Sequence, residues 1–158
     1  MAEPFKHYLE FQHVYKTFDR PILADVSFHV DNGETVAIIG RSGVGKSVSL
    51  QHIMGFMKPD AGRIIVGYQD VTDFTENEWR EVRKRVTMVF QSGALFDSLT
   101  IGENILFSLE LRDDYDQSSK LDVVRGLLRM VDLEGALDMY PADISTGYKR
   151  AVAIARAL

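Results

Sequence analysis

Residues 40–47 constrain the fold of this chain more than any other segment, because they match the pattern GxxxxGK[ST] in full. In this pattern the glycines let the backbone curl so that several N–H groups point inward, and the helix that follows adds the positive end of its dipole. Such a loop follows a buried strand and opens a helix. The pattern therefore predicts an α/β fold around a phosphate-binding loop. The residues expected to hold the phosphates of a nucleotide are Gly40, Arg41, Ser42, Gly43, Val44, Gly45, Lys46 and Ser47.

Two side chains of this loop have a specific predicted role. Lys46 is expected to reach the β and γ oxygens as a point charge, and the hydroxyl of Ser47 to ligate Mg²⁺. The flanking sequence agrees, since residues 35–39 are apolar and largely β-branched and residues 47–57 carry apolar side chains at helical spacing. The alternative is a glycine-rich turn that matches the pattern by accident.

Composition narrows the classes of protein to which the chain can belong. Its 158 residues are 46% hydrophobic and 26% charged, as in ordinary globular domains, so one domain is expected. The net charge of −5 argues against broad electrostatic binding to nucleic acid. Cysteine is absent, which excludes disulfides and thiolate metal sites. Neither a signal peptide nor an apolar run as long as a membrane span is present, so any work at a membrane is expected to need a partner.

The pattern of apolar residues predicts a small antiparallel sheet, then a core sheet, then helices. The expected strands are residues 9–14, 26–30, 35–39, 63–66 and 86–90, with turns at 17–21 and 31–34. The expected helices are residues 47–57, 76–83, 101–109, 118–131 and a last one from 145 or 147 to 158. We interpret residues 1–158 as one domain with three parts. These are an antiparallel part (1–34), a phosphate-loop core with a mixed sheet (35–91) and a mainly helical subdomain (92–158).

Two groups of titratable residues predict no site. The basic residues near the helix at 76–83 are mixed with glutamates at spacing that allows helical ion pairs, so we expect a solvated face. They are Arg80, Arg83, Lys84 and Arg85. The histidines lack the spacing of metal ligands and are expected on the surfaces of strands or helices. They are His7, His13, His29 and His52.

Three segments in order resemble the ATP-binding cassette family, the ATPase subunits of ABC transporters. The first is the phosphate loop. The second, residues 89–96, reads Val-Phe-Gln-Ser-Gly-Ala-Leu-Phe and looks like the Q-loop of that family. The third, residues 149–158, looks like the helix after the family's signature motif. Within this family, the sequence of residues 91–100 is similar to that of ATP-binding subunits of Mla/Mce-type lipid transporters.

The resemblance implies roles for residues outside the phosphate loop. Gln91 matches the Q-loop residue that ligates Mg²⁺ with Ser47, and its alternative is a polar residue that ends a strand. Phe18 matches the aromatic residue that stacks on adenine, with Tyr15 as the substitute, and its alternative is a turn aromatic folded onto the sheet. Ser145, Thr146 and Gly147 match the signature motif, which contacts ATP held by the opposite subunit. Thr146 and Tyr148 depart from the family pattern, and the alternative here is an ordinary capped helix.

The resemblance also implies what the chain would lack. It ends at Leu158, before the place where the family has the Walker B aspartate, the catalytic glutamate and the switch histidine. No catalytic residue is therefore predicted, and an incomplete domain of this kind is expected to bind nucleotide weakly and to hydrolyse it poorly or not at all. Its core sheet would also have uncovered edges.

The function implied is that of an ATP-binding subunit of an ABC transporter, with ATP and Mg²⁺ as cofactors. It would couple ATP binding and hydrolysis to the transport of a lipid or other hydrophobic substrate. Expected partners are transmembrane permease subunits and a second copy of the subunit, and nucleic acid is not expected. The expected location is cytoplasmic, on the inner face of the cell membrane. The alternative is a truncated, catalytically inactive nucleotide-binding or interaction module.

Overall fold

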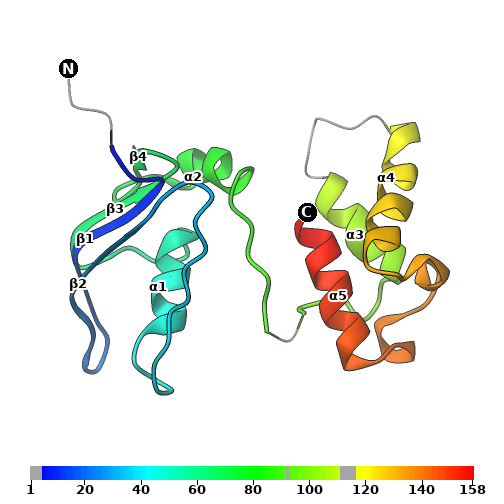
Figure 1. The fold of residues 1–158 in the computed structure, drawn as a ribbon, viewed down its shortest axis with the longest axis horizontal. Coiled ribbons are helices and arrows are strands. Elements are labelled where there is room, and N and C mark those ends of the chain that lie inside the picture. The colour runs from blue at the N-terminus through cyan, green and yellow to red at the C-terminus, as the bar shows by residue number, and fades with distance from the viewer. Residues whose placement is uncertain (1–4, 92, 111–116) are drawn as a thin grey trace. The chain divides into compact units, whose positions relative to one another are not determined.

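The computed structural model describes residues 5–91, 93–110 and 117–158, and these form two compact units. The first unit is Met1–Val86 and the second is Thr87–Leu158. Strands and two helices make up the first unit, and the second is helical (Figure 1). Each unit has its own hydrophobic core.

A four-stranded antiparallel sheet organises the first unit. Its strands are β1 (Leu9–Thr17), β2 (Pro21–Val30), β3 (Ala61–Val66) and β4 (Gln69–Asp70), in the order β2-β1-β3-β4. Every strand pairing is antiparallel, so the predicted mixed sheet is absent from the described residues. Leu9 pairs with Val30 on one side and Val66 on the other, which places β1 in the middle of the sheet. The strands predicted near the N-terminus are confirmed, and both are longer than predicted.

Two segments predicted as core strands do not form strands. Residues 35–39 and 86–90 are irregular, and Ile39 is 91% exposed while Phe90 is 42% exposed. A strand is stabilised by hydrogen bonds to a neighbour, and neither segment has a strand neighbour among the described residues. A cavity of about 370 Å³ separates residues 36–39 from β2. The prediction that the turn at 31–34 leads into an adjacent strand was therefore wrong.

The helices α1 (Lys46–Ile53) and α2 (Glu76–Arg83) contribute the remaining apolar side chains of this core. α1 ends before its predicted boundary, because Met54 closes it and Gly55 follows at a φ of +68°. α2 has the predicted bounds and begins with a capping box, in which Glu78 accepts from the backbone N–H of Thr75 at 2.7 Å.

The position of Arg83 differs from the prediction of a solvated basic face on α2, because its side chain contacts the end of α1. Its guanidinium donates to the carbonyl of Met54 at 3.1 Å and lies 5.5 Å from the ring centre of Phe56. It also forms an ion pair with Glu76. Arg83 therefore joins the end of α1 to α2. For Lys84 the prediction is confirmed, since it forms an exposed ion pair with Glu81 at 2.9 Å.

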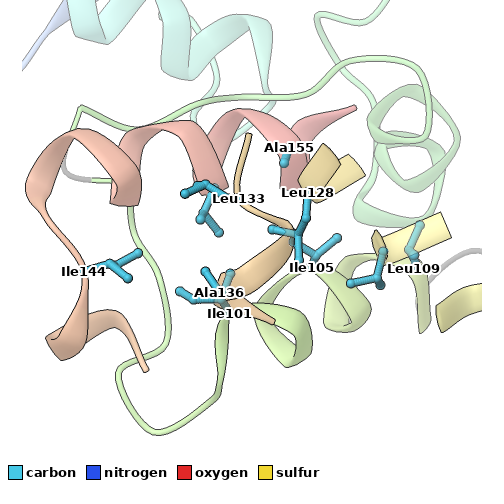
Figure 2. Packing of buried hydrophobic residues seen from close by; sticks show 10 residues of the cluster. Ile101, Ile105, Leu109, Leu128, Leu133, Ala136, Ile144 and Ala155 are labelled. Atoms are coloured by element: carbon cyan, nitrogen blue, oxygen red, sulfur yellow. The ribbon is translucent and has the colours of Figure 1, made fainter. Parts of the chain in front are cut away.

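The second unit is a helical cluster, as predicted. Its elements are α3 (Ile101–Glu110), α4 (Gln117–Met130), η1 (Glu134–Ala136), η2 (Pro141–Asp143) and α5 (Thr146–Ala157). Figure 2 shows the apolar side chains that fill its core, among them Ile101 and Ile105 of α3, Leu128 of α4 and Ala155 of α5. Within the described residues, no helix combines the length and apolar character that crossing a bilayer requires.

His52 is buried, in contrast to the surface position predicted for it. It lies on α1 with 1% of its surface exposed, and its Nδ1 forms a hydrogen bond of 2.7 Å with the carbonyl of Val48. Its Nε2 forms no hydrogen bond among the described residues. Burial lowers the pKa of His52 below 6.5, and the charge of Lys16 acts in the same direction.

We expect the free energy of unfolding of the first unit to decrease as the pH falls below 6.5, the ordinary pKa of histidine. Because the pKa is lowered in the folded state, the unfolded state takes up the proton first. The contribution of neutral His52 is therefore complete above pH 6.5 and is lost at lower pH, at no more than about 1.4 kcal/mol per pH unit. Urea unfolding at several pH values measures this slope.

The variant His52→Leu should lose this part of the pH dependence. His13→Gln is the matched control for the removal of a histidine, because the side chain of His13 is 77% exposed. Parallel curves for the unmodified chain and His52→Leu would contradict the assignment.

Candidate nucleotide-binding site

The predicted phosphate loop lies between the irregular residues 35–39 and the start of α1. Gly43 has a φ of +79° and Gly45 a φ of +99°, a region that L side chains rarely adopt. A Cβ on Gly45 would lie 2.8 Å from Cδ2 of Leu23 and 3.1 Å from the carbonyl oxygen of Ile22. The start of β2 thus leaves room only for glycine at position 45. The positive φ angles of Gly43 and Gly45 give the loop its curled backbone.

Lys46 lies within this loop. Its Nζ donates to the carbonyl oxygens of Gly40 and Arg41, at 2.7 Å in both cases. These bonds hold a positive charge next to the backbone that is predicted to surround phosphate. Ser47 follows as the second residue of α1 and is exposed, so its hydroxyl is open to a metal ion. The remaining loop residues, Arg41, Ser42, Gly43 and Val44, are exposed as well.

Phe18 lies in the turn between β1 and β2, in the same unit as the loop. Its ring is 53% exposed, and its backbone N–H donates to the carbonyl of Arg20 at 3.1 Å. The guanidinium of Arg20 lies 3.8 Å from the position of a Cβ on Gly43, so the turn and the loop are neighbours. Tyr15, the substitute candidate, is 41% exposed. The turn therefore offers an exposed aromatic ring close to the loop.

Gln91 belongs to the second unit, where it is exposed. Gly93 and Ala94 contact α5. Gly93 has a φ of +83°, and a Cβ there would lie 3.2 Å from the carbonyl of Lys149. Arg156 of α5 donates to the carbonyl of Ala94 at 2.7 Å and to that of Gly93 at 3.0 Å. The predicted Q-loop and the predicted signature helix are thus mechanically joined through Arg156.

The residues of the predicted signature motif form the start of α5. Ser145 is the N-cap, and its Oγ accepts from the backbone N–H of Tyr148 at 3.2 Å. A hydroxyl that accepts in this way still has its own proton to donate. Ser145, Thr146 and Gly147 are exposed, so the positive end of this twelve-residue helix faces solvent. The predicted N-cap is confirmed.

The site residues divide between the two units. The phosphate loop and Phe18 are in the first, while Gln91 and the start of α5 are in the second. Ser47 and Gln91, predicted to share one magnesium ion, are therefore in different units. Two residues that sequence reasoning missed are Arg20 and Arg156. No local pattern marks Arg156, because its contacts are with residues about sixty positions earlier in the chain. Arg20 lies near Gly43, which is likewise distant in the sequence.

Comparisons with known proteins give one consistent result. The model of the family described as "ABC transporter" matches residues 23–158. The chain is 40% identical over 149 residues to the "Sulfate/thiosulfate import ATP-binding protein CysA" of Caulobacter vibrioides, covering 92% of this chain and 42% of that protein. It is 41% identical over 139 residues to the "ABC transporter ATP-binding protein YtrE" of Bacillus subtilis, covering 87% of this chain and 60% of that protein.

A solved structure agrees with these relatives. It is the dimeric, post-hydrolysis state of the ATP-binding cassette MJ0796 bound to ADP and Pi. The TM-score is 0.86 at 30% identity, over 95% of this chain and 68% of that one. The chain spans about half the length of the curated relatives that it matches.

Proposed function

Because this chain belongs to the ABC transporter family, we propose that it binds Mg-ATP at residues 40–47 and acts as an ATP-binding subunit of a transporter. The observation that carries the proposal is the position of Lys46, whose ammonium group lies inside a loop shaped by Gly43 and Gly45. A triphosphate would replace the carbonyls of Gly40 and Arg41 as partners of Lys46, so that an ionised acceptor replaces two neutral ones.

The other loop residues complete the site for phosphate and metal. The N-terminus of α1 supplies backbone N–H groups and a positive potential. The exposed hydroxyl of Ser47 would ligate Mg²⁺, which neutralises phosphate charge when bound. Phe18 would stack on the adenine ring from the neighbouring turn, since its ring is exposed and stacking needs only a flat aromatic face.

We further propose that two copies of the subunit close around ATP, with Ser145 and Gly147 of one copy contacting the γ-phosphate held by the other. Two features support this role: the O–H of Ser145 can donate a hydrogen bond, since its oxygen is the acceptor in the cap, and the start of α5 is exposed. The related cassette MJ0796 is described as a dimer with ADP and Pi. ATP drives closure only to the extent that it binds the closed pair better than the open one.

The transported substrate is a separate question. The hypothesis of a lipid or other hydrophobic cargo rests on residues 91–100 alone, and the names of the relatives do not support it. Those names give sulfate or thiosulfate, methionine, and spermidine or putrescine as imported solutes. The partners we propose are permease subunits, with the chain at the inner face of the membrane.

Binding of Mg-ATP to the unmodified chain and to Lys46→Ala tests the proposal. We expect affinity to fall at least about 30-fold in the variant, because one charged donor to the phosphates contributes about 2 kcal/mol or more. Lys84→Ala is the matched control, since it removes an exposed lysine of the same unit and should bind as the unmodified chain does. Equal affinity of the unmodified chain and Lys46→Ala would contradict the proposal.

The rate of ATP hydrolysis in the same samples gives a second readout. Turnover that Lys46→Ala abolishes supports an ATPase. Binding that depends on Lys46 without turnover is compatible with both hypotheses, because the chain spans about half the length of its curated relatives.

A further inference from the structure

Three side chains with metal-binding atoms meet beside the sheet of the first unit. They are His7, which precedes β1, His29 near the end of β2, and Asp31, which follows β2. One ligand atom from each lies within 4.8 Å of the other two. The spacing of the histidines along the chain did not predict this cluster.

Sheet pairing creates the cluster. Leu9 of β1 pairs with Val30 of β2, which brings the segment before β1 next to the end of β2. Successive side chains of a strand point to opposite faces, so His29 and Asp31, two positions apart, are directed to the same side. Nδ1 of His7 lies 2.5 Å from Oδ1 of Asp31, and the rings of His7 and His29 stack with centroids 3.8 Å apart.

We propose that His7, His29 and Asp31 form a binding site for a divalent transition metal ion such as Zn²⁺. Imidazole nitrogen and carboxylate oxygen are ligands that Zn²⁺ accepts together, and three protein ligands leave a position for water. Mg²⁺ and Ca²⁺ prefer all-oxygen sites, so the two imidazoles select against them. The site is thus distinct in ligand chemistry from the magnesium position proposed beside the phosphate loop.

The geometry is close to what such an ion needs. Tetrahedral bonds of about 2.1 Å put ligand atoms about 3.4 Å apart, so the three atoms must shift by about an ångström. The cluster can make this shift, because His29 is exposed and the side chain of Asp31 is 60% exposed. The side chain of His7 is 15% exposed, which limits its freedom before an ion binds.

The charged groups near the cluster include two carboxylates and the ammonium group of Lys6, which acts on Asp31. Glu10 faces His29 across the β1–β2 pairing, and the carboxylate of Glu34 accepts from the backbone N–H of Asp31 at 2.9 Å.

Titration of the full, untagged chain with Co²⁺ and Zn²⁺, without nucleotide and with excess Mg²⁺, tests the proposal. Co²⁺ reports its ligands through visible absorption, and calorimetry gives the affinity for Zn²⁺. We expect one ion per chain. The variants His29→Gln and His7→Gln should each bind at least about ten-fold more weakly, because each loses one of three protein ligands.

The same hairpin contains a matched control. Nδ1 of His13 lies 2.7 Å from Oδ1 of Asp25, which is an exposed histidine–aspartate pair without a second imidazole. His13→Gln should therefore bind Zn²⁺ as the unmodified chain does, and circular dichroism should show all three variants folded. The proposal would be overturned by any of three results. These are failure to bind one ion per chain, unchanged affinity in His29→Gln, or a loss of affinity in His13→Gln as large as that in His29→Gln.

Discussion

Gly62→Ala is expected to destabilise the first unit by at least about 3 kcal/mol. Gly62 lies in β3 at a φ of +94°, and a Cβ there would lie 2.2 Å from the carbonyl oxygen of His13. The obstacle is the backbone of β1, the central strand, and not the end of a flexible side chain. The register between β1 and β3 shifts between Gln12 and Tyr15, so the bulge in β1 occupies the space that only glycine leaves open. Relief of the clash requires β1 and β3 to separate.

Urea unfolding followed by the fluorescence of Trp79 measures this effect, because Trp79 is the only tryptophan in the chain and is buried in the core of this unit. Gly67→Ala is the matched control. Gly67 has a φ of +60°, and a Cβ there meets nothing within 4 Å. It should cost only about 1–2 kcal/mol, which is the strain of a left-handed alanine without a clash. Similar losses in both variants would show that backbone strain, and not contact with β1, makes glycine necessary at position 62.

Asn104→Ala is expected to destabilise the second unit by about 2–4 kcal/mol. Asn104 lies on α3 and is fully buried. Its side-chain oxygen accepts from the backbone N–H of Phe96 at 2.7 Å. The two N–H groups of its amide are shared among three carbonyls, those of Phe96 at 3.0 Å, Leu99 at 3.1 Å and Thr100 at 2.9 Å. One side chain thus satisfies several backbone groups of the turn before α3, and alanine leaves them without that partner.

Hydrogen exchange followed by mass spectrometry measures this effect. Asn104→Ala should increase the exchange rates of the backbone amides in the turn at 96–100 and in α3. Ser108→Ala is the control on the same helix. The hydroxyl of Ser108 donates to a single carbonyl in its own helix, that of Ile105 at 2.7 Å, as far as the described residues show, so its loss should change stability by no more than about 0.5 kcal/mol. Unchanged exchange in Asn104→Ala would mean that the turn is held by other contacts.

Local signals in the sequence predicted the helices and the loop well. The predicted bounds of α2 agree with the structure, and Ser145, matched to the start of the signature motif, is the N-cap of α5. In the loop, Gly45 was predicted from its place in the pattern, and its φ of +99° beside Ile22 gives the structural reason. The roles of Phe18, Gln91 and Gly147 stay predictions.

Features that depend on residues distant in the sequence were predicted less well. Residues 35–39 have the composition of a buried strand, yet they form none, because a strand exists only where another segment supplies its hydrogen bonds. The burial of His52 and the contacts of Arg156 with Gly93 were missed for a similar reason. Neither depends on the neighbours of the residue in the chain.

The amino-acid sequence by itself determined the glycine-rich loop at 40–47, the helices and the cap at Ser145, because a helix closes its hydrogen bonds within four residues and a turn within three. Only the tertiary structure decided which strands pair and which titratable groups meet. The approach of His7 to Asp31 spans 24 positions and exists because β1 lies against β2. Sheet pairing joins residues that no local pattern relates, and a site made in this way becomes visible only once the chain has folded.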